Sequence, residues 1–201
     1  MRAPLPVLAG LLGAFAMAPT QAGTPSCGSA ARYTVVDLPF IPKVITPSGV
    51  VAGMTELHRA VVWRRESGPE ELSVPEGFRF TEPAAITTAG DVVINAFDAE
   101  GTQRGAFIYS HSSHSVFKLG GNQTWARGIG AAGLVVGEWV PEGKTATDAV
   151  YWNNTVPHSI GLCCSGTLKG ANARGDMAGD VYDEQGHYSS PWIRNGIRRQ
   201  R

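Results

Sequence analysis

The chain has 201 residues, with 17 Lys and Arg residues against 17 Asp and Glu residues, and charged residues make up only 17% of it. This length suits one domain with a sizeable core, and the balanced charge argues against a nucleic-acid or anionic-lipid partner. The 25 glycines and 13 prolines, with so few charges, are typical of short strands joined by tight turns.

The first 22 residues have the pattern of a secretory signal peptide. Arg2 precedes an apolar run from Leu5 to Ala18, and small residues lead to a predicted cleavage site after Ala22. The apolar run of about 14 residues is shorter than a membrane-spanning helix needs. We therefore predict a secreted or periplasmic protein with no membrane insertion after cleavage, in which residues 23–32 form a linker.

Three cysteines remain after the predicted cleavage. Cys27 lies in the linker, whereas Cys163 and Cys164 are adjacent. In an oxidising compartment Cys27 can pair with one of the two, and a bridge between the neighbours is the alternative. The surrounding residues offer too few further ligands to predict a metal site.

Residues 33–201 contain four repeats of about 42 residues. One segment recurs as VITPSGVVAGM, AITTAGDVVIN, GIGAAGLVVGE and ANARGDMAGDV, and its shared glycines are Gly49, Gly90, Gly133 and Gly175. A second apolar block follows each glycine, starting at Ala60, Ala106, Ala149 and Pro191. A third block closes the first three repeats, at residues 70–74, 115–119 and 158–162.

Each repeat predicts four short strands. A small inner segment such as 83–86 leads into a tight turn, where the shared glycine is favoured because the turn needs a positive φ. An apolar strand such as 92–96, a polar loop, an aromatic strand and a closing strand follow. We predict an all-β fold, a small β-propeller of four four-stranded repeats that is closed by an N-terminal strand over residues 33–38. An open fragment of a larger propeller is the alternative.

The third repeat also contains Gly-x-Gly-x-x-Gly, at Gly128, Gly130 and Gly133. A dinucleotide-binding loop of this spacing lies between a strand and a helix. Here the third glycine precedes LVVGEW, whose β-branched and aromatic residues favour a strand, and the other repeats lack the pattern. The motif therefore predicts a repeat turn, and we expect no cofactor.

YTVVDL, the repeated I-(N/T)-x-x-G-x-V-V-G pattern and the following x-A-F/V block resemble the HAF-repeat proteins. The resemblance covers nearly all of residues 33–195 and implies an extracellular protein with propeller-like repeats, with no activity to transfer. The His of the family's His-Ala-Phe is replaced by Arg59, Gly105, Asp148 and Ser190, and the Phe persists only as Phe107. The Asn of the family's Ile-Asn pair aligns with Thr46, Thr87, Gly130 and, one column earlier, Asn172.

Polar residues with a chemical alternative lie mostly in loops. DAEG at 98–101 and DEQG at 183–186 suit turns that begin with Asp and end with Gly, and calcium binding is the alternative. The acidic candidates for a ligand-binding loop are Asp98, Glu100, Glu142, Asp183 and Glu184. His111 and His114 favour a solvent-facing turn over a metal pair. Lys43 and Arg127 align on the inner strands, with Ala84 and Gly170 in the other repeats, and form a candidate anion site.

No nucleophile elbow of the Gly-x-Ser-x-Gly type occurs, and no polar constellation from several repeats is visible in the sequence. We therefore expect an exported, non-catalytic module that binds a glycan or a partner protein through loops on one face, at 98–103, 141–147 and 183–188. A secreted hydrolase or lyase is the alternative, because propellers often carry active sites at one mouth.

Overall fold

The computed structural model describes residues 35–161, 165–183 and 188–194. The predicted signal peptide, the linker, the three cysteines and Glu184 lie outside the described residues. No helix in the described part of the chain is long and apolar enough to cross a membrane. All four sheets belong to one compact unit, Asp37–Arg201.

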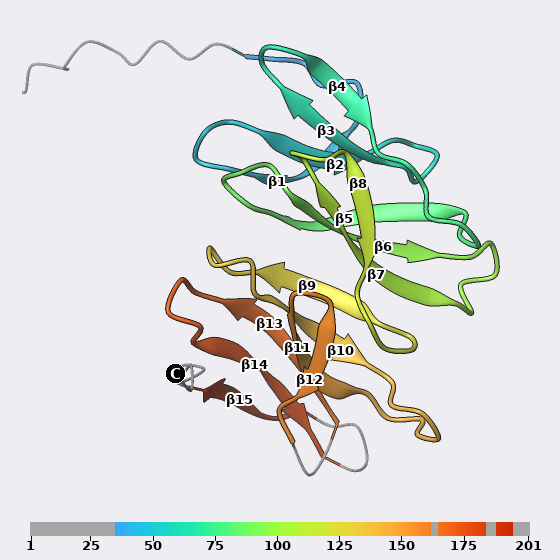
Figure 1. Ribbon diagram of the computed structural model, residues 1–201, viewed down its shortest axis with the longest axis vertical. Helices are drawn as coiled ribbons and strands as arrows, with labels where there is room; N and C mark the ends of the chain where they lie inside the picture. Colours follow the sequence, from blue (N-terminus) through green and yellow to red (C-terminus); the bar gives the residue numbers. More distant parts are fainter. Residues whose placement is uncertain (1–34, 162–164, 184–187, 195–201) are drawn as a thin grey trace, which may run out of the picture. The chain divides into compact units, whose positions relative to one another are not determined.

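The described fold is all-β, with antiparallel sheets that follow one another in chain order (Figure 1). The first sheet contains β1 (Ile41–Ile45), β2 (Val51–Met54), β3 (Ala60–Arg64) and β4 (Gly68–Glu71). The second contains β5 (Phe80–Ile86), β6 (Val92–Phe97), β7 (Arg104–Ser110) and β8 (Ser115–Lys118). The third contains β9 (Trp125–Ile129), β10 (Val135–Trp139), β11 (Asp148–Asn153) and β12 (Val156–Ser159), and the fourth contains β13 (Gly166–Ala171), β14 (Met177–Tyr182) and β15 (Tyr188–Arg194).

The predicted turn at each shared glycine is confirmed. Gly49, Gly90, Gly133 and Gly175 have φ of 84°, 92°, 79° and 81°, where a side chain would be strained. In each turn the amide of the glycine donates to the carbonyl three residues earlier, as from Gly133 to Gly130 at 2.9 Å. The Gly-x-Gly-x-x-Gly segment is therefore one of four equivalent strand turns.

A polar side chain caps three of these four turns. Thr46 Oγ1 accepts from the Val50 amide at 3.0 Å, and Thr87 Oγ1 accepts from the Asp91 amide at 3.1 Å. Asn172 Oδ1 accepts from the Asp176 amide at 3.0 Å, so Asn172 occupies the same column as the threonines and is not shifted from it. The side-chain oxygen in this column satisfies a turn amide.

The cores lie between consecutive sheets. Val92, Ile94 and Phe107 pack with residues of the first sheet, whereas Val93 on the same strand packs with Val135 and other residues of the third sheet. A smaller cluster joins the third sheet to the fourth. Strand β6 is apolar except for Asn95 because both of its faces are buried.

The predicted N-terminal clasp is wrong for the described residues. Residues 35–38 form no strand, and the fourth sheet has only the order β13–β14–β15. Leu38 instead packs with Phe40, Val51 and Val61 on the first sheet. This apolar contact anchors the segment to the sheet that directly follows it, and no closure between the first and fourth sheets is seen among the described residues.

Candidate functional site

A row of aromatic rings runs across the loop ends of the first three sheets. His58, in the loop between β2 and β3, meets Phe80 edge-on with ring centroids 5.8 Å apart. Phe80 and Phe97 are 5.4 Å apart, and Phe97 and Trp125 are 6.3 Å apart. Phe80, Phe97 and Trp125 are half-buried, so each keeps part of its ring accessible. We call these four residues the aromatic row.

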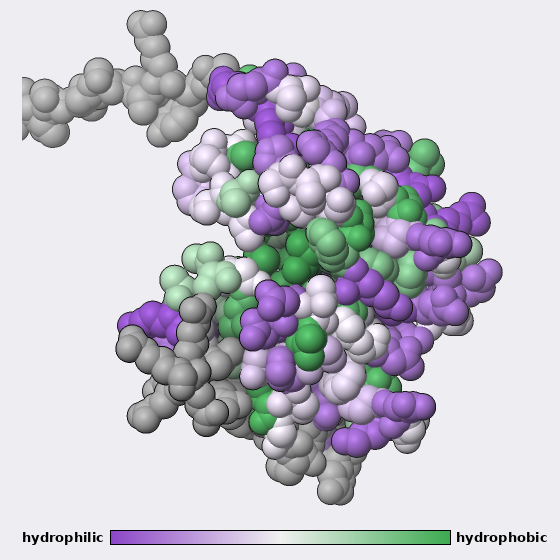
Figure 2. Space-filling model, in the orientation of Figure 1, coloured by the Kyte–Doolittle hydropathy of each residue, from purple (hydrophilic) through white to green (hydrophobic). Residues whose placement is uncertain are grey.

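Strand register explains why these side chains meet. Phe80 begins β5 and pairs directly with Phe97 at the end of β6, so the two rings share one end of the second sheet. Trp125 begins β9, which packs against the strands of the second sheet. Hydrophilic residues predominate on the side of the molecule where the β6–β7 and β10–β11 loops project, at the right of Figures 1 and 2.

Three arginines lie against the row. The guanidinium carbon of Arg79 is 5.4 Å from the centroid of the Phe80 ring. Those of Arg104 and Arg127 are 5.4 Å and 5.8 Å from the Trp125 ring. These distances allow cation–π attraction. Arg127 also donates to Glu138 at 2.8 Å, which fixes its position and balances its charge.

Two adjacent hollows open beside Trp125, each with a volume of about 340 Å³. Both are lined by Gly101, Arg104 and Trp125. The first, which we call the Glu82 hollow, is completed by Glu82, Phe97 and Arg127. The second, which we call the threonine hollow, is completed by Thr102, Gln123, Glu138, Val140, Thr145 and Thr147. Aromatic surface and polar groups thus line one continuous region between the second and third sheets.

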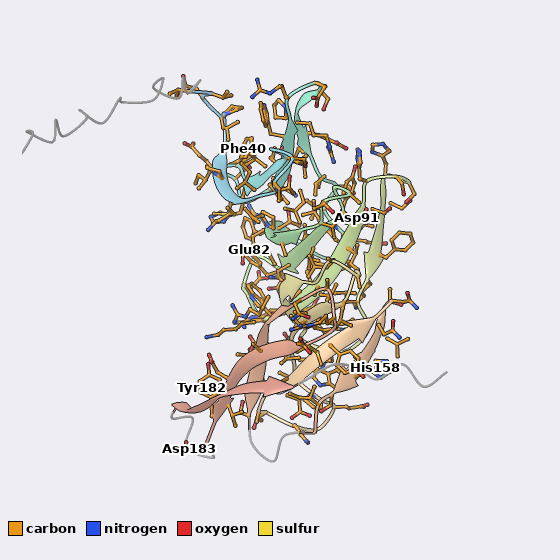
Figure 3. The ribbon with its side chains drawn as sticks, turned by 90° about the vertical axis from the view of Figure 1, so that its left-hand side faces the viewer. Phe40, Glu82, Asp91, His158, Tyr182 and Asp183 are labelled. Atoms are coloured by element: carbon orange, nitrogen blue, oxygen red, sulfur yellow. The ribbon has the colours of Figure 1, made fainter. Side chains whose placement is uncertain are left out.

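Two of the three predicted loops contribute to this region, and residues 184–187 of the third lie outside the described residues. Gly101 and Thr102 belong to the loop at 98–103, and Thr145 and Thr147 belong to the loop at 141–147. Gln123 joins the region through its Nε2, which donates to the Thr102 carbonyl at 2.8 Å. Asp183 follows β14 in the fourth sheet and lies away from Glu82 (Figure 3).

The predicted acidic loop residues that the structure describes, Asp98, Glu100, Glu142 and Asp183, do not line either hollow. Asp98 holds its own loop, because its carboxylate accepts from the Thr102 amide at 2.7 Å and from the Thr102 hydroxyl at 2.6 Å. The Thr102 hydrogen bond, with further backbone donors, lowers the pKa of Asp98. This arrangement supports the turn interpretation. Glu100 and Glu142 are exposed to solvent.

The predicted anion site at Lys43 and Arg127 requires correction. The register shifts at the same place on the first strand of every sheet, so Lys43, Ala84, Arg127 and Lys169 are the four bulged residues. Lys169, rather than Gly170, therefore belongs to this column. Lys169 pairs with Asp180 on the neighbouring strand, as Arg127 does with Glu138, so these two cations are already balanced by carboxylates.

A second polar constellation lies at the other ends of the strands and joins the first two sheets. We call Arg64, Glu70, Tyr109, His111 and His114 the Glu70 cluster. Arg64 donates to Glu70 at 3.2 Å and is 3.0 Å from His111 Nδ1. The Tyr109 hydroxyl donates to Glu70 at 2.7 Å and lies 2.8 Å from His114 Nδ1.

The Glu70 cluster is a clamp between sheets. Asp91 accepts from the His111 amide at 3.0 Å, and Figure 3 shows Asp91 well separated from Glu82. Burial raises the pKa of Glu70, but the Tyr109 hydrogen bond, Arg64 and His114 together lower it more, so the pKa lies below its ordinary value. Burial and the Glu70 carboxylate raise the pKa of Tyr109 to about 12.

No group of three His, Cys, Asp or Glu side chains in the described part of the chain is arranged to hold a metal.

The sequence interpretation missed both constellations. Phe80, Phe97, Trp125 and Arg104 lie at strand ends, where single aromatic residues have no distinctive spacing. A repeat alignment that marked aromatic and arginine residues flanking each polar loop would have selected Phe97, Arg104 and Trp125. Glu70 and Tyr109 are 39 positions apart and come from different repeats, so only the packing of the two sheets reveals their contact.

Comparisons with known proteins give little further information. No family model and no curated protein sequence matches the chain. Among solved structures, a crystal structure of TolB from Acinetobacter baumannii is similar at a TM-score of 0.44 and 13% sequence identity. The match covers 79% of this chain and 44% of the TolB chain, so this chain spans less than half the length of that protein. The described part of the chain consists of repeated antiparallel sheets.

Proposed function

We propose that this protein is an exported, non-catalytic repeat module that binds a glycan through the aromatic row and the two hollows beside Trp125. Export is inferred from the signal-peptide pattern of residues 1–22. We further propose that the sheets are successive blades of an open propeller segment, because each sheet packs on the next along the chain.

Membership of the HAF-repeat family is part of the proposal. Two positions of the family pattern have a structural role in this chain, and both roles support membership of the family. The Thr or Asn before the shared glycine caps the turn, as in Thr46 and Asn172. The Ala of the second block is fully buried at Ala60 and Ala106, where the next repeat supplies a hydroxyl to its amide.

The observation that carries the glycan proposal is the combination of partly exposed rings with polar groups around them. A sugar ring has flat C–H faces that pack on an aromatic ring, and hydroxyls around its edge that need hydrogen-bond partners. Trp125 and Phe97 offer the rings, while Glu82, Gln123 and Thr145 offer acceptors and donors. Ligand sites in general combine apolar walls with a few polar groups in this way.

A glycan is favoured over a partner protein because the region is hollowed and combines aromatic surface with polar groups. Protein interfaces depend on a buried apolar centre. Among the described residues, the exposed large apolar side chains lie outside both hollows: Val35, Val36, Ile41 and Ile45 in or just before β1, and Leu57, Phe117 and Val156 elsewhere.

A panel of neutral and acidic oligosaccharides, measured by titration calorimetry and for turnover, tests the proposal. We expect binding without turnover, and we expect Trp125→Ala to weaken it at least tenfold because a stacking surface is lost. Phe117→Ala is the matched control, since Phe117 is 48% exposed on the closing strand β8. Equal weakening by both substitutions, or binding of a protein but of no saccharide, would contradict the proposed glycan site. Turnover of an oligosaccharide would favour the hydrolase or lyase alternative.

A further inference from the structure

Two of the arginines on the aromatic row have no carboxylate partner in the part of the chain that the structure describes. Arg79 and Arg104 are both exposed, and their described contacts are with the rings of Phe80 and Trp125. Arg64, Arg127 and Arg174, by contrast, each form an ion pair. The charge on the row is therefore least balanced at Arg79 and Arg104.

Arg104 is placed to receive an anion. It begins β7 and pairs in register with Phe97, so its backbone is fixed at the rim of both hollows. The contact of its guanidinium with the Trp125 ring leaves N–H donors free at the edge of the group. Such a planar fork binds a carboxylate or sulfate through two parallel hydrogen bonds.

The acidic residues nearby indicate which hollow takes the anion. Glu82 lies only in the Glu82 hollow, where its charge would repel an acid group. The one carboxylate of the threonine hollow, Glu138, is tied to Arg127 at 2.8 Å. Thr145 and Thr147 add hydroxyls beside Arg104. An acid group is therefore accommodated in the threonine hollow, while Glu82 is left to accept hydrogen bonds from neutral sugar hydroxyls.

We infer that the glycan is acidic, with a carboxylate or sulfate that binds Arg104 in the threonine hollow while an adjacent neutral part of the chain lies in the Glu82 hollow. This inference rests on the proposed glycan binding and adds the class of ligand. Arg79, on the ring of Phe80, extends the same charge along the row toward the next sugar units.

The test compares a trisaccharide of galacturonate with its methyl ester, which has the same skeleton without the charge. Calorimetry on the wild-type protein is expected to show at least tenfold tighter binding of the acid, with an advantage that shrinks as NaCl rises. Arg104→Gln should remove this advantage of the acid over the methyl ester. Arg65→Gln is the control, because Arg65 is exposed in the β3–β4 turn and lies outside the aromatic row and both hollows.

A sulfated galactose trisaccharide and its unsulfated form distinguish the two sources of the charge. Preference for either charged form, lost in Arg104→Gln, supports the inference and identifies the acid group. Equal binding of charged and neutral forms to the wild type would overturn the inference while leaving glycan binding intact. Failure of every saccharide, with correct folding shown by circular dichroism, would instead overturn the proposed function and this inference with it.

Discussion

Single hydroxyl groups join neighbouring sheets. Thr81 Oγ1 accepts from the Ala60 amide at 2.9 Å, and Thr124 Oγ1 accepts from the Ala106 amide at 2.8 Å, both in buried surroundings. Asn95 forms a similar link, since its side chain both donates to and accepts from the backbone of Ala126 at 2.9 Å. Each link satisfies a backbone group that would otherwise be buried without a partner.

The threonine link predicts a measurable contrast between two substitutions. Thr124→Val leaves the Ala106 amide unpaired and is expected to lower the free energy of unfolding by about 1–3 kcal/mol. Thr167→Val is the matched control, because Thr167 is buried and its hydroxyl has no hydrogen-bond partner among the described residues. We expect Thr167→Val to be neutral or slightly stabilising in urea denaturation. Equal losses for both variants would show that the hydrogen bond to Ala106 is not what Thr124 contributes.

At the scale of elements, the Glu70 cluster fastens β4 to β7 and to the turn that follows β7. Arg64 is 12% exposed and Glu70 36% exposed, so the ion pair is partly shielded from water. The first two sheets are thus held by an apolar core and by this polar contact at the strand ends.

The cluster predicts an acid dependence of stability. The pKa of Glu70 is lowered in the folded state, so the carboxylate stabilises the fold above its ordinary pKa of about 4.5, and the contribution is lost as pH falls through the lower folded pKa. At pH 7, Glu70→Gln should have a lower urea midpoint than the wild type. At pH 3, the difference between the two midpoints should be smaller. Glu71→Gln, at the exposed neighbouring position, should follow the wild-type profile. A Glu70→Gln profile parallel to wild type would contradict the clamp.

Strands and turns could be predicted from the sequence where the same residue pattern recurs in all four repeats, because each recurrence meets the same physical requirement. The turn glycines were predicted because a positive φ excludes most side chains, and β6 because alternate residues face two cores. The N-terminal strand was predicted wrongly because its β-branched residues suit a strand in any sheet, whereas Leu38 and Phe40 have a nearer apolar surface. The site escaped prediction because Arg104 and Trp125 come from different repeats.

At the scale of the whole molecule, the two polar constellations lie at opposite ends of the strands and differ in how their charges are paired. The ends beside the Gly90 turn, which we call the turn side, carry the Glu70 cluster, whose groups bind one another. The ends beside the β6–β7 loop, which we call the loop side, carry the aromatic row. There Arg79 and Arg104 contact aromatic rings and form no ion pair among the described residues. Internally satisfied groups stabilise the fold, whereas unbalanced groups beside a hollow are the ones that a ligand can engage.

A crystal structure of the protein with the tightest-binding oligosaccharide of the panel tests this division most directly. We predict that a sugar ring lies against Trp125 or Phe97, between the loops at 98–103 and 141–147, with its acid group on Arg104. An oligosaccharide bound at the turn side, against the Glu70 cluster or the turn at Gly90, would contradict the account.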